Sequence, residues 1–176
     1  MSGEKIWLFD TTLRDGGQTR GVDFSRADKM AIAHALDDIG IDYIEGGWPG
    51  ANPTDDAFFA NPPKLKKAKL FAFGMTRRGG RSAANDPGLN AVIDAEVDGA
   101  CLVGKTWDFH VKTALNTTLD ENLQMIQDSL AAAKQRGRDP MFDCEHFFDG
   151  YKHNPDYAIN CVSAAHEGGA SWVVLC

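Results

Sequence analysis

Short apolar runs alternate along the chain with longer amphipathic segments. The runs recur at intervals of roughly 30 to 40 residues, the length of one strand–helix unit. They are continuous rather than alternating, which is typical of parallel strands covered on both faces. They occupy residues 6–9, 43–44, 70–73, 100–103, 141–142 and 172–176.

Helix signals lie between the apolar runs. Ser25 and Asp28 have the spacing of a capping box, and Gly40 stands where that helix should stop. Similar start and stop signals frame two later segments, and apolar positions at helical spacing support each of them. Five helices are therefore predicted, over residues 25–40, 55–61, 87–96, 118–137 and 154–167.

The pattern thus predicts an α/β fold with six strands and five helices, beginning and ending with a strand. Two architectures fit this order: an open doubly wound sheet, or a (β/α)8 barrel cut short after its sixth strand. A complete barrel typically needs about 250 residues. The periodicity of apolar residues does not distinguish these two architectures. The residues in the loops have to decide between them.

Composition narrows the class of protein. A length of 176 residues fits one domain or a piece of a larger one, and 43% hydrophobic with 24% charged residues is typical of a soluble globular chain. A net charge of −7 argues against nucleic-acid binding, and no apolar run is long enough to span a membrane. The four cysteines lack C-x-x-C spacing and the N-terminus lacks a signal peptide, which predicts reduced thiols in a cytoplasmic protein.

Polar residues follow four of the six runs, at the predicted C-terminal ends of the strands. Active sites of parallel α/β folds form at these ends, so the four groups together predict one pocket. The groups are residues 10–18, residues 45–50, the set Lys105, Trp107, Asp108 and His110, and the set Asp143, Glu145 and His146.

The adjacent pair Arg14 and Asp15 is the most informative of these groups. A carboxylate beside two glycines can reach a divalent cation, and hard cations prefer oxygen ligands. The neighbouring guanidinium can hold an anionic oxygen of a substrate. On spacing alone, an ordinary surface ion pair in a turn is the favoured interpretation of the pair.

Three motifs give the chain a family resemblance. Segment 10–16 (DTTLRDG) resembles the signature of the metal-dependent acyltransferase and lyase superfamily, which includes 2-isopropylmalate, homocitrate and citramalate synthases. Segments 44–53 (IEGGWPGANP) and 145–151 (EHFFDGY) are similar to the citramalate-synthase branch. The resemblance extends over essentially the whole chain. It departs at Gly17, where many relatives have Glu, Ala or Ser before the glutamine.

The resemblance implies a (β/α)8 TIM barrel, of which residues 1–176 would be the N-terminal part of a single catalytic domain. Strands seven and eight and any regulatory domain would be absent. The family also carries a His-x-His pair on its seventh strand that completes the metal site, and this sequence has no such pair. The fragment alone is therefore expected to be inactive.

The implied reaction is a Claisen-type condensation of acetyl-CoA with a short 2-oxo acid, pyruvate first among them, giving citramalate and CoA. The alternatives are a lyase or aldolase of the hydroxymethylglutaryl-CoA lyase type, or a catalytically inactive fragment. The implied partners are these small molecules and a second copy in a full-length homodimer, with no nucleic acid and no membrane. The cofactor would be a divalent cation, Mg²⁺ or Mn²⁺, with Zn²⁺ as an alternative.

The resemblance also assigns roles to individual residues. Asp15 would be a metal ligand, Arg14 would stabilise charge on the keto oxygen, and Glu145 would lie near the 2-oxo acid or the acetyl methyl group. Four further residues are expected to bind substrate or support the residues that do: Gln18, Glu45, Lys105 and His110.

Overall fold

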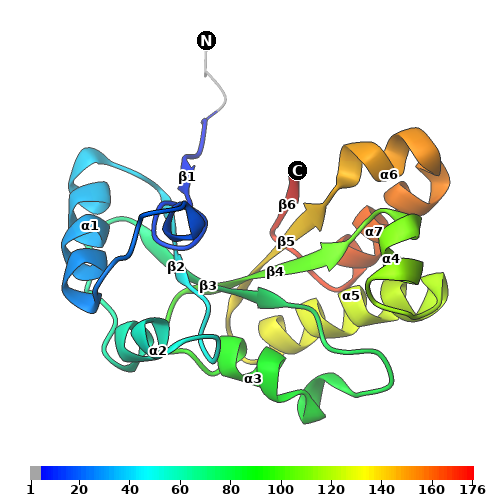
Figure 1. Ribbon diagram of the computed structural model, residues 1–176, viewed down its shortest axis with the longest axis horizontal. Helices are drawn as coiled ribbons and strands as arrows, with labels where there is room; N and C mark the ends of the chain where they lie inside the picture. The colour runs from blue at the N-terminus through cyan, green and yellow to red at the C-terminus, as the bar shows by residue number, and fades with distance from the viewer. Residues whose placement is uncertain (1–4) are drawn as a thin grey trace. The chain divides into compact units, whose positions relative to one another are not determined.

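The computed structural model describes residues 5–176 and divides the chain into two compact units. The first unit is Met1–Phe73 with Ala95–Asp98, and the second is Gly74–Asp94 with Gly99–Cys176. The sequence predicts that the N-terminus lacks a signal peptide. Residues 1–4 of that segment lie outside the described residues. Figure 1 shows the helices and strands of both units.

The first unit holds three parallel strands in chain order. β1 pairs with β2 through Phe9 and Tyr43, and β2 pairs with β3 from Tyr43 and Lys69 onward. Phe58, Phe71 and Ile44 are fully buried and form its core. Its elements are β1 (Phe9–Asp10), η1 (Gly16–Gln18), α1 (Arg26–Ile39), β2 (Tyr43–Gly47), α2 (Pro53–Ala60) and most of β3 (Lys69–Met75).

The second unit also holds parallel strands in chain order. β4 pairs with β5 along its whole length, from Gly99 opposite Asp139 to Lys105 opposite Glu145, and β5 pairs with β6. Its elements are η2 (Ala83–Asn85), α3 (Pro87–Ile93), β4 (Gly99–Lys105), α4 (Asp108–Thr113), α5 (Leu119–Gln135), β5 (Asp139–Glu145), α6 (Phe147–His153), α7 (Pro155–Glu167) and β6 (Trp172–Leu175).

The order of the strands confirms the predicted fold class. Beyond the end of β3, the Thr76 N–H donates to the Val103 carbonyl of β4 at 3.2 Å, so β3 and β4 are neighbours as well. The full order is β1-β2-β3-β4-β5-β6 with parallel pairing, and helices follow the strands in sequence. This is the arrangement of the first six strands of a (β/α)8 barrel.

The predicted caps form as the sequence indicates. The Ser25 hydroxyl accepts from the Asp28 N–H at 3.2 Å, and the Asp28 carboxylate accepts from the Ser25 N–H at 2.9 Å, which completes the capping box at the start of α1. Thr118 and Asn154 cap α5 and α7 in the same way, by accepting from backbone N–H groups. Local side-chain chemistry therefore fixes where the long helices begin.

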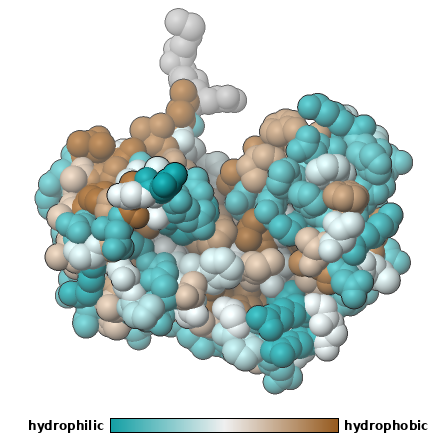
Figure 2. All heavy atoms as spheres, viewed as in Figure 1, coloured by the Kyte–Doolittle hydropathy of each residue, from teal (hydrophilic) through white to brown (hydrophobic). Residues whose placement is uncertain are grey.

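Two parts of the pattern were predicted wrongly. The run at residues 6–9 gives only a two-residue strand, and Ile6, Trp7 and Leu8 are 81%, 43% and 51% exposed. Figure 2 shows brown, hydrophobic surface around the start of β1. The short helices α4 and α6 were not predicted, because one or two turns are too few to produce a helical period.

Two further findings concern the class of protein. No helix within residues 5–176 combines the length and the apolar character needed to cross a bilayer. The four cysteines are unbonded; Cys101, Cys144 and Cys161 are buried and Cys176 is exposed.

We predict that Gly150→Ala destabilises the second unit. A Cβ at position 150 would lie 2.4 Å from the Thr106 carbonyl oxygen, so α6 would have to move away from the end of β4. Overpacking of this kind costs about 1–3 kcal/mol, and urea unfolding measures it. Gly137→Asn is the matched control, because that position has a left-handed φ of 76° and open space around it. An equal loss in both variants would contradict the prediction.

Candidate active site

The DTTLRDG segment forms a tight turn directly after β1. Asp10, the last residue of the strand, accepts from the Thr12 N–H at 2.9 Å and from its hydroxyl at 3.2 Å. The Thr11 carbonyl then accepts from the N–H groups of Arg14 and Asp15 at 3.2 and 2.8 Å. These bonds bring Arg14 and Asp15 to the C-terminal end of the strand, where the sequence predicted a site.

A buried carboxylate fixes the position of Arg14. Glu45, in the middle of β2, is 1% exposed, and its Oε2 accepts from the Arg14 Nε at 2.5 Å. The guanidinium carbon also lies 4.0 Å from the centre of the Phe73 ring, which packs edge-on against Trp48. A buried charge of this kind is tolerated only when it is paired, so Glu45 holds the guanidinium in one orientation.

Asp15 is the residue of this chain that the sequence predicts as a metal ligand. Its side chain is 61% exposed, and its Oδ1 accepts from the Arg14 Nη1 at 3.2 Å. Within residues 5–176, no group of three or more His, Cys, Asp or Glu side chains could hold a metal ion. The donor chemistry of Asp15 fits one ligand of a hard cation, and the described residues do not form a complete site.

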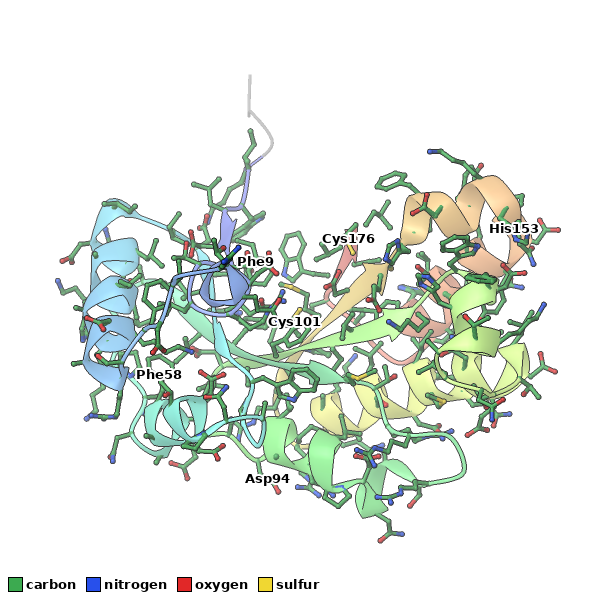
Figure 3. All side chains as sticks on the ribbon, in the orientation of Figure 1. Phe9, Phe58, Asp94, Cys101, His153 and Cys176 are labelled. Atoms are coloured by element: carbon green, nitrogen blue, oxygen red, sulfur yellow. The ribbon has the colours of Figure 1, made fainter. Side chains whose placement is uncertain are left out.

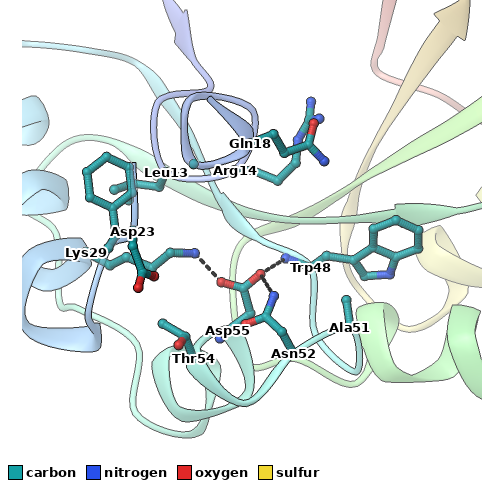
Figure 4. Close-up of a pocket in the computed structure, with 12 residues that line it drawn as sticks. Leu13, Arg14, Gln18, Asp23, Lys29, Trp48, Ala51, Asn52, Thr54 and Asp55 are labelled. Carbon is teal, nitrogen blue, oxygen red and sulfur yellow. Dashed lines mark hydrogen bonds and ion pairs between the residues drawn. The ribbon is translucent and has the colours of Figure 1, made fainter. Parts of the chain in front are cut away.

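A cavity of about 260 Å³ lies beside this turn in the first unit, and Arg14, Gln18 and Trp48 line part of it (Figure 4). A buried ion pair between Lys29 and Asp55 forms another part of its wall. The Asp55 carboxylate also accepts from the Trp48 N–H and the Asn52 side-chain amide, each at 2.9 Å, and the Lys29 ammonium donates to the Gly46 carbonyl at 3.0 Å.

The glycine at position 47 is required by this ion pair. Gly47 has a φ of 146°, and a Cβ there would lie 2.6 Å from the Asp55 carboxylate and 2.8 Å from the Lys29 ammonium. Asn52 caps α2 by accepting from the Asp55 N–H at 2.9 Å, which orients Asp55 toward the loop after β2. The GGWPGANP segment is therefore built around the Lys29–Asp55 pair.

In the second unit, Lys105 and Glu145 form an ion pair. They are the last residues of β4 and β5 and lie opposite each other in the sheet register, and Glu145 accepts from the Lys105 ammonium. The Glu145 backbone carbonyl accepts from the Thr106 hydroxyl at 2.8 Å. The sequence predicted both residues as site residues, and the structure adds that they are partners.

His110 lies in a group of rings beyond these strand ends. Its ring is 4.6 Å from both the Trp107 and the His146 rings, measured between centroids. The His110 Nδ1 and the Trp107 Nε1 are buried and have no hydrogen-bond partner within residues 5–176. Buried polar atoms are normally paired, so these two nitrogens mark a place where a ligand or water can bind.

The structure therefore gathers the predicted residues in two groups, one in each unit. Arg14, Asp15, Gln18 and Glu45 belong to the first unit, and Lys105, His110 and Glu145 belong to the second. Sequence reasoning missed Lys29 and Asp55. A signal was available in the Asn-Pro start of α2 with an acid at its third position, which is a capping arrangement.

Comparison with known proteins identifies the family. A sequence profile described as HMGL-like matches residues 5–176, and the chain therefore belongs to the HMGL-like family. It is 53% identical over 175 residues to an (R)-citramalate synthase of Aquifex aeolicus, and 53% identical over 176 residues to one of Streptomyces coelicolor. Each match covers 98% of this chain and 33% of the relative, so the chain spans about a third of the length of these relatives.

A more distant relative and a solved structure are consistent with this family and with the fold. A 2-isopropylmalate synthase of Sulfurisphaera tokodaii is 31% identical over 172 residues, which are 97% of this chain and 42% of the relative. The HMG-CoA lyase of Bacillus subtilis has a TM-score of 0.75 at 19% identity, covering 97% of this chain and 57% of that one. At that identity the likeness shows the fold alone, and it is the truncated TIM-barrel fold that the sequence predicted.

We predict that Lys29→Met destabilises the first unit by about 3–5 kcal/mol, because it leaves the Asp55 carboxylate buried without its partner charge. The double variant Lys29→Met/Asp55→Leu removes both charges and should recover part of the loss. Urea unfolding of Lys29→Met, Asp55→Leu and the double variant measures the difference. A double variant as unstable as the sum of its single changes would contradict the pairing.

Proposed function

We propose that the protein carrying this chain condenses acetyl-CoA with a short 2-oxo acid, pyruvate in the first place, and releases citramalate and CoA. The observation that carries the proposal is identity of 46–53% with (R)-citramalate synthases over nearly the whole chain. These relatives are about three times longer, so the activity is proposed for the complete protein.

The first unit supports charge stabilisation on the 2-oxo acid. In a Claisen condensation, negative charge develops on the ketone oxygen as the new carbon–carbon bond forms. A guanidinium held rigidly by a buried carboxylate stabilises such charge, because it need not reorganise during the reaction. Arg14, fixed by Glu45 and packed over Phe73, has this character.

The cation belongs to the same proposal. Asp15 would hold a divalent ion, Mg²⁺ or Mn²⁺, together with ligands from elsewhere in the longer protein. Such an ion, when bound, polarises the ketone carbonyl as a Lewis acid. Arg14 keeps its own role beside it, because its Nη1 already lies 3.2 Å from the Asp15 carboxylate.

The second unit supports proton handling and binding of the anionic substrate. Glu145 is a carboxylate at the end of β5 whose side chain is partly exposed, so a substrate can reach it. We propose that it lies near the 2-oxo acid or the acetyl methyl group, and that Lys105 positions it through the ion pair. His110 offers its buried, unpartnered Nδ1 to the same substrates.

A coupled assay tests the reaction. The full-length protein should release free CoA from acetyl-CoA only when a 2-oxo acid is present, and pyruvate should be the best acceptor. Residues 1–176 alone should release none, and light scattering of the full-length protein should show a homodimer. Cleavage of hydroxymethylglutaryl-CoA without condensation would overturn the proposal in favour of a lyase.

We predict that Asp15→Asn and Arg14→Lys in the full-length protein fail for different reasons. Asp15→Asn should weaken cation binding, because an amide lacks the charge of a carboxylate. Arg14→Lys should leave cation affinity close to wild type and lower turnover, because an ammonium cannot reproduce the planar fork. Calorimetric titration with Mn²⁺ separates the two effects, and unchanged affinity in Asp15→Asn would refute the ligand assignment.

A further inference from the structure

A histidine–carboxylate pair lies at the end of β5, and the proposed reaction gives it no role. The His146 Nδ1 is 3.1 Å from the Asp149 Oδ2, and the two side chains are 45% and 53% exposed. His146 directly follows Glu145, and Asp149 lies in the first turn of α6. The pair is thus held at the same strand end as Glu145.

The backbone at His146 is strained. Its φ and ψ are 55° and 37°, the left-handed region that costs a residue with a Cβ about 1–2 kcal/mol. This one residue turns the chain from β5 into α6, and glycine or asparagine would make the turn at less cost. Strain that persists where a cheaper residue fits points to a role for the side chain.

A cavity of about 280 Å³ lies against the pair. It is lined by Glu145, His146, Phe148, Asp149 and Cys176. The unpartnered Trp107 Nε1 and His110 Nδ1 belong to rings whose centroids lie 6.1 and 4.6 Å from that of His146. The pair therefore borders both a space for a ligand and two nitrogens that need a hydrogen-bond partner.

We propose that His146, oriented by Asp149, is the general base that activates water for hydrolysis of the thioester formed by the condensation. This assignment rests on the proposed function. The Asp149 carboxylate accepts the Nδ1 proton, which leaves the Nε2 lone pair available as a base. Glu145 is already paired with Lys105, so His146 supplies a base that is free of that ion pair.

The His146 Nε2 takes one proton from water, and the water oxygen bonds to the thioester carbonyl carbon. The tetrahedral adduct then collapses, its carbon–sulfur bond breaks, and the electron pair leaves on sulfur. The imidazolium returns its proton to the thiolate, which gives free CoA and a carboxylic acid.

Other groups in the cavity do not replace His146 in this step. Partial burial and the neighbouring Asp143 carboxylate raise the pKa of the Cys176 thiol to about 12, so this thiol stays protonated at neutral pH. The groups that face His146 from its own and neighbouring elements are Asp149, Glu145, His110 and Cys176.

The tautomer of His146 gives a test that does not depend on activity. In full-length protein labelled with ¹⁵N-histidine, the His146 resonances should show a protonated Nδ1 and an unprotonated Nε2. Asp149→Ala should shift the ring toward the other tautomer. A wild-type ring protonated on Nε2, or a ring unaffected by Asp149→Ala, would overturn the proposed orientation.

Chemical rescue tests the step itself. Glycine accepts the left-handed backbone, so His146→Gly should fold, and CoA release should fall about a hundredfold, as for loss of a general base. Quenched samples should contain the accumulated thioester adduct, and added imidazole should restore part of the release. A purely structural role for His146 would give no adduct and no rescue.

His153→Ala is the matched control. His153 also bonds to a carboxylate, with its Nδ1 2.9 Å from Asp108, but it lies at the other end of α6 from Cys176 and the cavity (Figure 3). It should release CoA at the wild-type rate. If the wild type is active and His146→Gly releases CoA at the same rate, the role of His146 as general base is overturned and the proposed function is not. A wild type without release that depends on the 2-oxo acid would instead overturn the proposed function and the hydrolytic step with it.

Discussion

The buried carboxylate of Glu45 is the constraint on which the candidate site in the first unit depends. A charge that is almost completely removed from water must be paired, and the partner is Arg14 from the turn after β1. The pairing ties β2 to the DTTLRDG turn and holds the guanidinium in one orientation. Asp15, the adjacent residue, is thereby placed beside a fixed positive charge at the strand end.

The same principle explains the loop after β2. Lys29 and Asp55 come from two different helices and are both buried, so the backbone has to pass close to them, and Gly47 allows it to do so. Two buried ion pairs thus border the cavity of the first unit. Removing these charges from water costs free energy. Such a cost is typical of sites where fixed charges act on a substrate, and less so of sites that serve stability alone.

In the second unit, the turn at the end of β5 depends on a close approach between backbone segments. Gly150 lets α6 pack against the Thr106 carbonyl, and the left-handed His146 makes the turn that begins this helix. The EHFFDGY segment therefore brings Glu145, His146 and Asp149 to the end of β5.

The sequence by itself determined the six strands, five of the helices, the caps that begin α1, α5 and α7, the family, and the strand ends at which the polar residues gather. These features depend on periodicity, capping and motif, which are local in the chain. Only the tertiary structure decided that Arg14 pairs with Glu45, Lys29 with Asp55 and Lys105 with Glu145. Each pair joins residues 26 to 40 positions apart, and their contact follows from strand register and helix packing, which no local pattern encodes.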